Sequence, residues 1–193
     1  MTLNRRTLLA AGAAAPALAL TGCAGLPGAK PIAHVVVIGG GYGGATAAKY
    51  IRRWAPQIAV TLVERNEAFV SCPISNLVLA GQKTLANITV PYDGLARHGV
   101  RVVRDEATAI DVEKKQVRLA RGEPLAYDRL IVAPGIDFQF DGIPGLAAAE
   151  ASGRALHAWK AGPQTVALRR QLEAMPDGGV FAITIPKAPY RCP

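Results

Sequence analysis

The chain has 193 residues, half of them hydrophobic, which allows a sizeable core and excludes an intrinsically disordered protein. Its formal net charge is +8, but Arg5 and Arg6 near the N-terminus contribute two of these charges and the others are dispersed. No basic patch interleaved with aromatic residues occurs, so the sequence argues against nucleic acid as a partner.

Residues 1–29 are predicted to be a leader. Arg5 and Arg6 form a twin-arginine pattern, and an apolar, alanine-rich run follows them up to Thr21. This run is too short for a transmembrane helix, which needs about 20 apolar residues. A twin-arginine leader is typical of export after folding, so we expect the mature protein in the bacterial periplasm.

The leader ends in a short motif that bears on membrane attachment. Leu20-Thr21-Gly22-Cys23 resembles a bacterial lipobox, in which Cys23 is lipidated after cleavage. Two alternatives stay open, a leader that is cut nearby and a leader that is kept as an uncleaved anchor. The motif therefore predicts attachment through Cys23 as one of three outcomes.

A complete βαβ unit occupies residues 34–64. An apolar strand is expected at 35–38, a helix that ends near Trp54, and a second strand at 60–63. A Gly-x-Gly-x-x-Gly motif lies between the first strand and the helix. Because the motif stands in this context, the unit predicts a dinucleotide site; the alternative is a structural turn that binds nothing.

The glycines and the acid that closes the unit are the candidate binding residues. Gly39 permits a tight turn, Gly41 lets the backbone approach a pyrophosphate, and Gly44 lets the helix and strand pack closely. The diphosphate would lie at the positive N-terminal end of the helix. Glu64, 20 residues after Gly44, can accept a hydrogen bond from a ribose hydroxyl.

The next segments complete the layout of a flavin domain, which we place at residues 30–150. In chain order the patterns predict a loop at 65–73, a short helix at 74–81, helical turns at 91–98, a third parallel strand at 100–103, an antiparallel hairpin at 107–120 and a strand at 127–133. This order is the layout of the FAD domain in two-dinucleotide-fold flavoproteins, so the fold class is α/β, Rossmann-like with a β-meander.

A second glycine turn follows the last of these strands. The sequence YDRLIVAPG resembles the second motif of such flavoproteins, in which Gly135 after Pro134 brings the backbone close to the flavin side of the cofactor. We add Ala107, at the start of the hairpin, to the candidate cofactor-binding residues. Together with Glu64, these residues favour FAD over NAD in this site.

Residues 151–193 read as a connection and the beginning of a second dinucleotide-like domain. A helix is expected at 164–174, a turn at 177–179 and an apolar strand at 180–185. A proline-rich segment follows this strand instead of a glycine-rich phosphate loop, which argues against NAD(P)H. Because this layer is unfinished, we expect the chain to be an N-terminal piece of a longer protein; the alternative is a genuine short chain.

Three cysteines and three histidines complete the chemistry-bearing residues. Cys72 stands alone where disulfide reductases carry a Cys-x4-Cys pair. In the periplasm, Cys72 and Cys192 have three open fates: pairing with each other, pairing with cysteines outside this sequence, or carrying a covalent group. The three histidines do not cluster at metal-ligand spacing, so no metal site is predicted.

Four segments together resemble a known family. They are GGGYGGATAAKYIRR, SCPISNLVLAG, HAWKAGPQT and PYRCP, and in this order they resemble the flavoprotein subunit of flavocytochrome c sulfide dehydrogenase, which is related to sulfide:quinone oxidoreductases. The resemblance extends from about residue 33 to the end. It implies FAD, sulfide as the substrate and a c-type cytochrome subunit as the electron acceptor.

The resemblance also implies roles for two cysteines. Cys72 matches the cysteine that attaches FAD covalently through a thioether, although a small buried hydrophobe is the alternative. Cys192 matches one half of a redox disulfide whose partner lies outside these residues, and this makes Cys192 the candidate catalytic residue. Hydrosulfide would attack that disulfide to give a persulfide and a thiolate. Trp159 and Lys160 match the family without a predicted chemical role.

Two other functions stay open from the sequence. One is a flavoprotein of the sulfide:quinone or NADH:quinone type. The other is an FAD-binding fragment without activity, because the second cysteine and the remainder of the FAD domain are absent from these 193 residues. On its own, this polypeptide is expected to be inactive.

Overall fold

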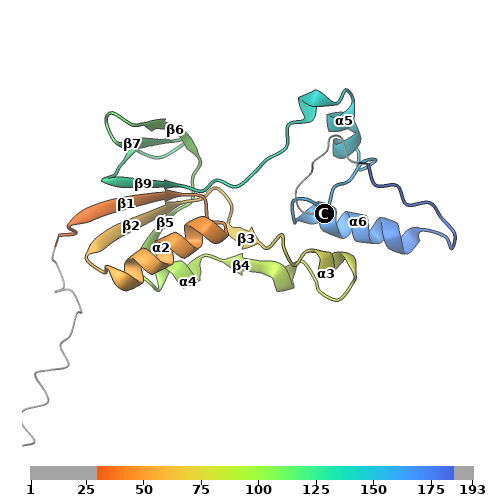
Figure 1. The fold of residues 1–193 in the computed structure, drawn as a ribbon, viewed down its shortest axis with the longest axis horizontal. Helices are drawn as coiled ribbons and strands as arrows, with labels where there is room; N and C mark the ends of the chain where they lie inside the picture. Colours follow the sequence, from red (N-terminus) through yellow and green to blue (C-terminus); the bar gives the residue numbers. More distant parts are fainter. Residues whose placement is uncertain (1–29, 185–193) are drawn as a thin grey trace, which may run out of the picture. The chain divides into compact units, whose positions relative to one another are not determined.

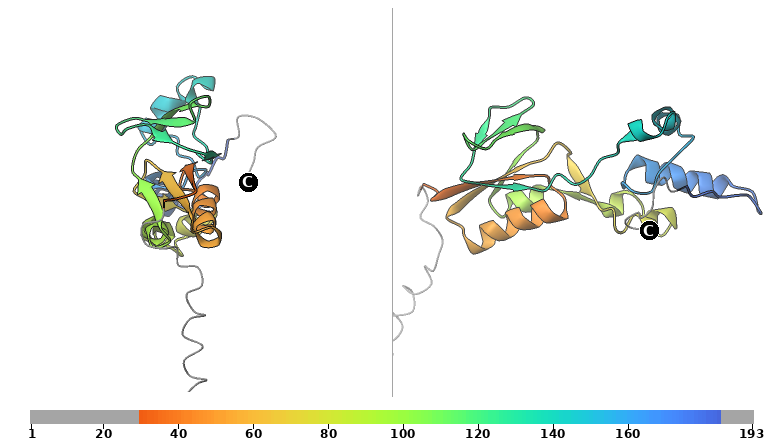
Figure 2. Two further views of the ribbon diagram at one scale, coloured as in Figure 1. Left: turned by 90° about the vertical axis from the view of Figure 1, so that its left-hand side faces the viewer. Right: turned by 45° about the horizontal axis from the view of Figure 1, so that its top comes forward.

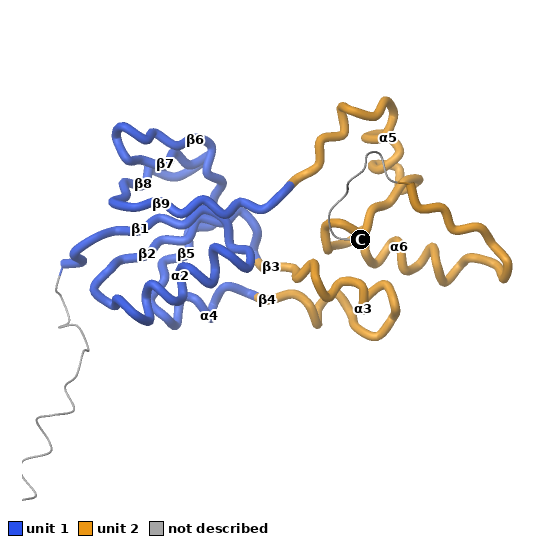
Figure 3. Tube along the Cα trace, in the orientation of Figure 1, with its two compact units in different colours: residues 1–67, 91–136 blue, residues 68–90, 137–193 orange. Residues whose placement is uncertain are grey.

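A computed structural model of the chain describes residues 30–184. The predicted leader with Cys23 and the candidate catalytic Cys192 lie outside the described residues. The chain forms two compact units, which Figure 3 distinguishes by colour. Unit 1 contains residues up to 67 and residues 91–136, and unit 2 contains residues 68–90 and those from 137 onward.

Unit 1 is built on a four-stranded parallel sheet with the order β5-β2-β1-β9. The strands are β1 (Ala33–Ile38), β2 (Ile58–Val63), β5 (Val100–Val103) and β9 (Arg129–Val132). Val36, Val37 and Leu62 in the two central strands are fully buried. Such continuous apolar runs are expected of parallel strands, because both faces of the sheet are covered.

Different elements pack on the two faces of this sheet (Figure 1). Helix α2 (Tyr42–Trp54), which connects β1 to β2, packs on one face, and the short helix α4 (Asp93–Ala96) precedes β5. On the other face, Val117 packs against Val36 and Val63 of the sheet. The two further views in Figure 2 show the same layers. The predicted βαβ unit and third parallel strand are confirmed.

The predicted β-meander packs on the second face. It consists of β6 (Ala107–Asp111), β7 (Gln116–Leu119) and β8 (Leu125–Ala126), all antiparallel. Lys115 has a φ of 50° in the turn between β6 and β7. The chain then enters β9, which pairs with the free side of β1.

Unit 2 consists of short elements. β3 (Ala68–Val70) and β4 (Thr89–Pro91) form a two-stranded sheet. The helices are α3 (Asn76–Leu79), η2 (Ala86–Ile88), η3 (Phe140–Gly142), α5 (Leu146–Ala151) and α6 (Pro163–Ala174). Arg169 of α6 donates from Nη1 to the Leu79 carbonyl of α3 at 2.9 Å, which holds these two helices together. The predicted helices at 74–81 and 164–174 are confirmed.

Two expectations for unit 2 were wrong. The predicted loop at 65–73 contains β3, and the predicted strand at 180–185 has no regular structure over its described part, residues 180–184. Val180 is 92% exposed. An isolated apolar segment cannot form a strand without a neighbour, and no strand in the described part of the chain pairs with it. The domain boundary expected near residue 150 stays a prediction.

The described helices are short, and the longest of them, α2, has 13 residues. Within residues 30–184, none is both long enough and apolar enough to cross a membrane.

Candidate dinucleotide-binding site

The candidate site lies beside β1, where the order in which the chain adds strands to the sheet of unit 1 reverses. From β1 the chain crosses to β2 on one side, whereas β9 joins β1 on the other side. In open α/β sheets, ligands bind at such a switch point, outside the carboxyl ends of the strands. The glycine turn after β1 and the Pro-Gly turn after β9 both lie at this place.

Gly39 and Gly44 are glycines for steric reasons. Gly39 has a φ of 94°, and a Cβ atom there would lie 2.1 Å from the Ala133 carbonyl oxygen. A Cβ atom on Gly44 would lie 1.9 Å from the Gly39 carbonyl oxygen and 3.2 Å from Cγ1 of Val37. These distances leave no room for a side chain, so the tight turn and the close packing of helix on strand hold as predicted.

The two glycine motifs contact each other. The Ala133 N–H donates to the Ile38 carbonyl at 2.8 Å, which continues the β1–β9 pairing by one residue. Pro134 and Gly135 follow directly, and Gly135 has a φ of 80°. The sequence placed these motifs about 95 residues apart without joining them, and the structure brings them together.

Helix α2 begins beside this turn. Gly41 is its N-cap residue, with no side chain to cap the helix, and the first turn contains no acidic residue. The N-terminal end of a helix attracts anions through its N–H groups and dipole. This end of α2 therefore suits a diphosphate.

Glu64 follows β2 and is already held in place by the backbone. Its Oε2 accepts from the Gly40 N–H at 2.7 Å, and its Oε1 accepts from the Asn66 N–H at 2.8 Å and from the Asn66 side chain at 2.7 Å. The carboxylate that was expected to meet a ribose hydroxyl thus also orders the glycine turn.

Tyr92 is a contact of this turn that the sequence did not reveal. It is buried, and a Cβ atom on Gly40 would lie 2.5 Å from its hydroxyl oxygen. The Arg104 guanidinium lies 4.8 Å from the centre of its ring. Burial, followed by the negative charge of Glu64, raises the pKa of Tyr92 to about 12, although Arg104 acts in the opposite direction. The run of three glycines was the one signal of so close a contact.

Ala107 lies at the first position of β6, opposite Leu119. It is partly buried against the cluster of Val36, Val63 and Val117. This contact gives Ala107 a packing role, and its expected role in cofactor binding stays a prediction.

Cys72 belongs to unit 2 and is exposed, with a free thiol. Its Sγ donates to the Trp159 carbonyl at 2.8 Å, and its own carbonyl accepts from the Ser75 hydroxyl at 2.8 Å. Within the described residues Cys72 is therefore not buried, and its expected role in cofactor attachment stays a prediction. The contact joins two of the family-like segments, SCPISNLVLAG and HAWKAGPQT, and the latter had no predicted role.

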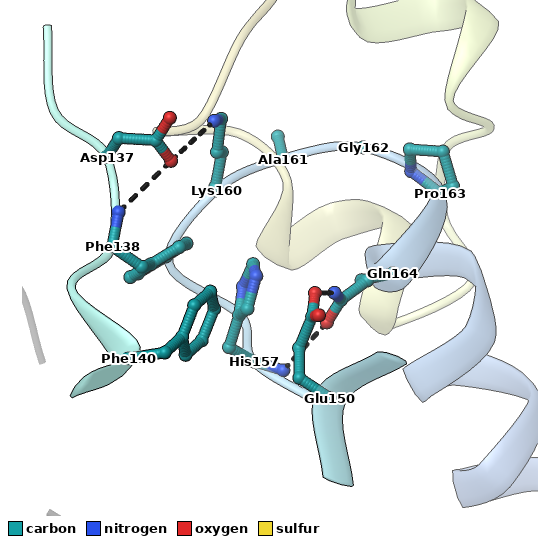
Figure 4. Close-up of a pocket in the computed structure, with 10 residues that line it drawn as sticks. All are labelled: Asp137, Phe138, Phe140, Glu150, His157, Lys160, Ala161, Gly162, Pro163 and Gln164. Carbon is teal, nitrogen blue, oxygen red and sulfur yellow. Dashed lines mark hydrogen bonds and ion pairs between the residues drawn. The ribbon is translucent and has the colours of Figure 1, made fainter. Parts of the chain in front are cut away.

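A pocket of about 260 Å³ lies farther along the same unit (Figure 4). His157 lies against Phe138, with ring centroids 4.3 Å apart, and Lys160 pairs with Asp137 at 3.0 Å. Burial lowers the pKa of His157, against the opposing effect of Glu150, and nearby Lys160 lowers it further. The Nδ1 atom of His157 is buried and has no hydrogen-bond partner.

The remaining site predictions concern a metal and the catalytic cysteine. Within residues 30–184, no group of three His, Cys, Asp or Glu side chains could hold a metal ion. Cys192 lies outside the described residues, so its predicted role is untested.

The parallel sheet, its switch point and the glycine turn define a dinucleotide-binding domain of the Rossmann type. Residues 33–170 match the family described as pyridine nucleotide-disulphide oxidoreductase. The chain belongs to this family. Residues 165–193 also match the central region of the sulfide dehydrogenase [flavocytochrome c] flavoprotein chain.

Individual relatives agree with these matches. A sulfide dehydrogenase [flavocytochrome c] flavoprotein chain from Chlorobaculum thiosulfatiphilum is 64% identical over 45 residues, which are 23% of this chain and 94% of the relative. A sulfide-quinone reductase from Aquifex aeolicus is 31% identical over 103 residues, which are 53% of this chain and 24% of the relative. The resemblance stated from the sequence is confirmed.

A solved structure supports the fold. The sulfide:quinone oxidoreductase from Aquifex aeolicus superimposes with a TM-score of 0.64 at 26% sequence identity, over 75% of this chain and 32% of that chain. The present chain thus spans about a quarter to a third of the length of these sulfide:quinone relatives.

Proposed function

We propose that this chain is the N-terminal part of an FAD-dependent enzyme that oxidises sulfide. The observation that carries the proposal is the contact between the Gly39 turn and the Ala133-Pro134-Gly135 turn at the switch point of the sheet. The similarity to a flavocytochrome c flavoprotein chain and to sulfide:quinone reductases supports sulfide as the substrate.

The residues of unit 1 fit a dinucleotide. The Gly39–Gly44 turn packs too tightly for side chains at Gly39 and Gly44, the start of α2 suits the diphosphate, and Glu64 suits a ribose hydroxyl. Pro134 and Gly135 would border the flavin side. Bound FAD would supply a two-electron acceptor that can return its electrons singly.

We further propose that Cys72 holds this cofactor covalently. The thiol is exposed, and its backbone is fixed by Ser75. The hydrogen bond to the Trp159 carbonyl orients the sulfur. A thioether would replace the S–H bond of Cys72 and one C–H bond of the flavin 8α carbon, with the flavin as acceptor of the two electrons, so this hydrogen bond would be lost on attachment.

Cys192 would act on sulfide as one half of a disulfide. Hydrosulfide attacks one sulfur, the S–S bond breaks, and the products are a persulfide on one cysteine and a thiolate on the other. The thiolate then carries the electron pair that the enzyme passes on. The partner cysteine lies outside this sequence.

The acceptor and the compartment complete the proposal. A c-type cytochrome subunit would take the electrons in the periplasm, reached through the twin-arginine leader, and Cys23 would carry a lipid anchor. The name of the Chlorobaculum relative supports the cytochrome partner, and the leader motif supports the compartment.

Acid precipitation of the full-length protein from its natural reading frame tests the covalent bond. We expect yellow colour in the wild-type pellet and in a Cys192→Ser pellet, but free flavin in the supernatant of Cys72→Ala. Flavin that leaves the wild-type pellet would refute covalent attachment.

Sulfide-dependent reduction of cytochrome c tests the chemistry separately. Cys192→Ser should lose this activity while its pellet stays yellow, so the two cysteines act as controls for each other. Activity that survives Cys192→Ser would refute the disulfide step. A second candidate, sulfide:quinone oxidoreduction, has support from the Aquifex relative, and reduction of a soluble quinone in place of cytochrome c would favour it.

A further inference from the structure

The end of unit 1 opposite the dinucleotide site carries exposed aromatic and basic side chains. All four strands of the parallel sheet begin at this end, and α2 ends there (Figure 1). The Ile32 N–H donates to the Gln57 carbonyl at 3.1 Å, which joins the start of β1 to the turn after α2. We name this region the Trp54 surface and define it by Lys30, Ile32, Lys49, Tyr50, Arg53 and Trp54.

Large apolar side chains are exposed on this surface. Trp54 is 78% exposed and Ile32 is 73% exposed. The Trp54 ring contacts the Tyr50 ring with centroids 4.9 Å apart, so the two aromatic residues form one apolar platform. Single exposed apolar residues are common, whereas apolar side chains that are exposed together mark interaction surfaces.

The charge beside the platform is positive. Lys49 Nζ lies 5.8 Å and the Arg53 guanidinium 5.5 Å from the centre of the Tyr50 ring, and α2 contains no acidic residue. Arg52 is engaged elsewhere, because its Nη1 donates to the carbonyls of Pro56 and Ile58. Asp128, an acid near the start of β1, accepts from the His34 N–H.

We propose that the Trp54 surface binds the anionic surface of a lipid membrane. Trp and Tyr place an apolar ring and a polar group at the level of lipid headgroups, and Lys and Arg attract anionic lipids. The surface shares none of the residues assigned to sulfide chemistry, and the turns at the carboxyl ends of the strands stay accessible when it is occupied.

The position of the N-terminal segment favours a membrane over an acidic protein as the partner. Lys30, the first described residue, belongs to this surface, and Cys23 precedes it by only seven residues in the sequence. Seven residues span at most about 25 Å, so a lipid on Cys23 would keep the Trp54 surface near the bilayer. The anchor belongs to the proposed function, whereas the surface binding can be tested without it.

Vesicle sedimentation with the full-length protein carrying Cys23→Ser, which removes any lipid, tests the proposal. We expect binding to vesicles that contain phosphatidylglycerol and much weaker binding to pure phosphatidylcholine vesicles. Arg53→Glu with Trp54→Ala should reduce the binding roughly tenfold or more, since each basic residue contributes about fivefold. Added salt should weaken it as well.

A matched variant controls for the change of charge and apolar area. Val112→Ala with Lys114→Glu makes similar changes on the β6–β7 turn, where Val112 is 74% exposed, and should leave binding unchanged. Arg53→Glu alone, checked for an unchanged unfolding midpoint, guards against misfolding. The proposal would be overturned by equal binding to both vesicle types or by an equal loss of binding in both double variants. It would also be overturned if the protein bound no vesicles and Arg53→Glu with Trp54→Ala lost the cytochrome subunit, because the surface would then bind a protein.

Discussion

In the glycine turn after β1, an added Cβ atom would meet different neighbours at different glycines. A Cβ atom on Gly44 would meet the backbone at 1.9 Å, and one on Gly40 would meet the ring of Tyr92 at 2.5 Å. On Gly43 the nearest neighbour would be the Ala133 Cβ atom at 3.9 Å, an ordinary contact. The motif therefore contains positions that require glycine beside one that tolerates a side chain.

This difference predicts a large loss of stability for one substitution and little change for a similar one. Gly44→Ala should lower the free energy of unfolding by about 1–3 kcal/mol, because the clash is with backbone, and should weaken dinucleotide binding. Gly43→Ala should change stability by less than about 1 kcal/mol, since alanine suits a helix. Urea unfolding of both variants measures this, and equal losses would contradict the steric argument.

The raised pKa of Tyr92 predicts a pH dependence of stability. The folded state binds the phenol proton more tightly, so this contribution is complete below the ordinary pKa of 10.0 and is lost as the pH rises to about 12. Unfolding free energy should therefore fall more steeply between these values in the wild type than in Tyr92→Phe. Parallel profiles for the two proteins would show that Tyr92 titrates normally.

Between elements, Asp105 connects the end of β5 to the turn after β7. Its carboxylate accepts from the backbone N–H groups of Glu106, Arg121 and Gly122, and Arg121 Nε lies 3.5 Å from it. Burial would raise the pKa of Asp105, but these three donors and Arg121 together lower it below 3.8. One side chain thus fixes the meander against the sheet.

Asp105→Asn should therefore lower the urea midpoint at neutral pH, because an amide has one acceptor oxygen for these donors. The stability that the carboxylate provides is present above its ordinary pKa and is lost as the pH falls through the lower folded value. The difference between the proteins should shrink toward pH 3. A constant difference across this range would assign the effect to packing. Asp111→Asn, on the same hairpin, is a suitable control.

The elements with regular apolar patterns were the ones that the sequence could predict. The periodicity of hydrophobic residues predicted β1, α2, β2, β5 and the β6–β7 hairpin with bounds close to those in the structure. β3 was missed because three residues carry too little pattern, and its existence depends on β4, about 20 residues later.

The candidate site was predicted in part for a similar reason. The requirement for glycine at position 44 can be read from the motif, because a Cβ atom there would meet Gly39, five residues earlier, whereas the Ala133 neighbour of Gly39 is distant in sequence. The contacts of Tyr92 with Gly40 and of Cys72 with Trp159 join distant segments, the latter 87 residues apart. Such contacts follow from the tertiary structure, so no local pattern reveals them. The expected strand at 180–185 failed because apolar residues alone do not supply a pairing partner.

At the scale of the whole molecule, the two units differ in their cores. Unit 1 holds most of the buried hydrophobic residues, whereas unit 2 contributes Val78 and Ile88 to them, together with buried Ser71, Ser75 and Thr165. Local stability follows the apolar area that is buried. The described parts of the chain should therefore open at different free energies.

Hydrogen exchange of the full chain can measure this difference. Amides of β1 and β2 should exchange slowest, and those of α3 and α6 faster. Val36→Ala, which removes two fully buried methyl groups at a cost of about 2 kcal/mol or more, should accelerate exchange in β1, β2 and β9 and leave α6 unchanged. Exposed Val112→Ala is the control. Uniform acceleration throughout the chain would indicate a single cooperative unit.

The pairing of β9 with β1 has a consequence for the order of assembly. It joins residues 94 positions apart, from Val35 to Arg129, whereas β1 and β2 are joined by a single helix. During synthesis, β1, α2 and β2 leave the ribosome long before β9, and one side of β1 stays unpaired until residue 132 is available. The Gly39 turn acquires its Ala133 neighbour only then, so the cradle for the cofactor is completed late in folding and insertion of the dinucleotide must follow translation of the meander.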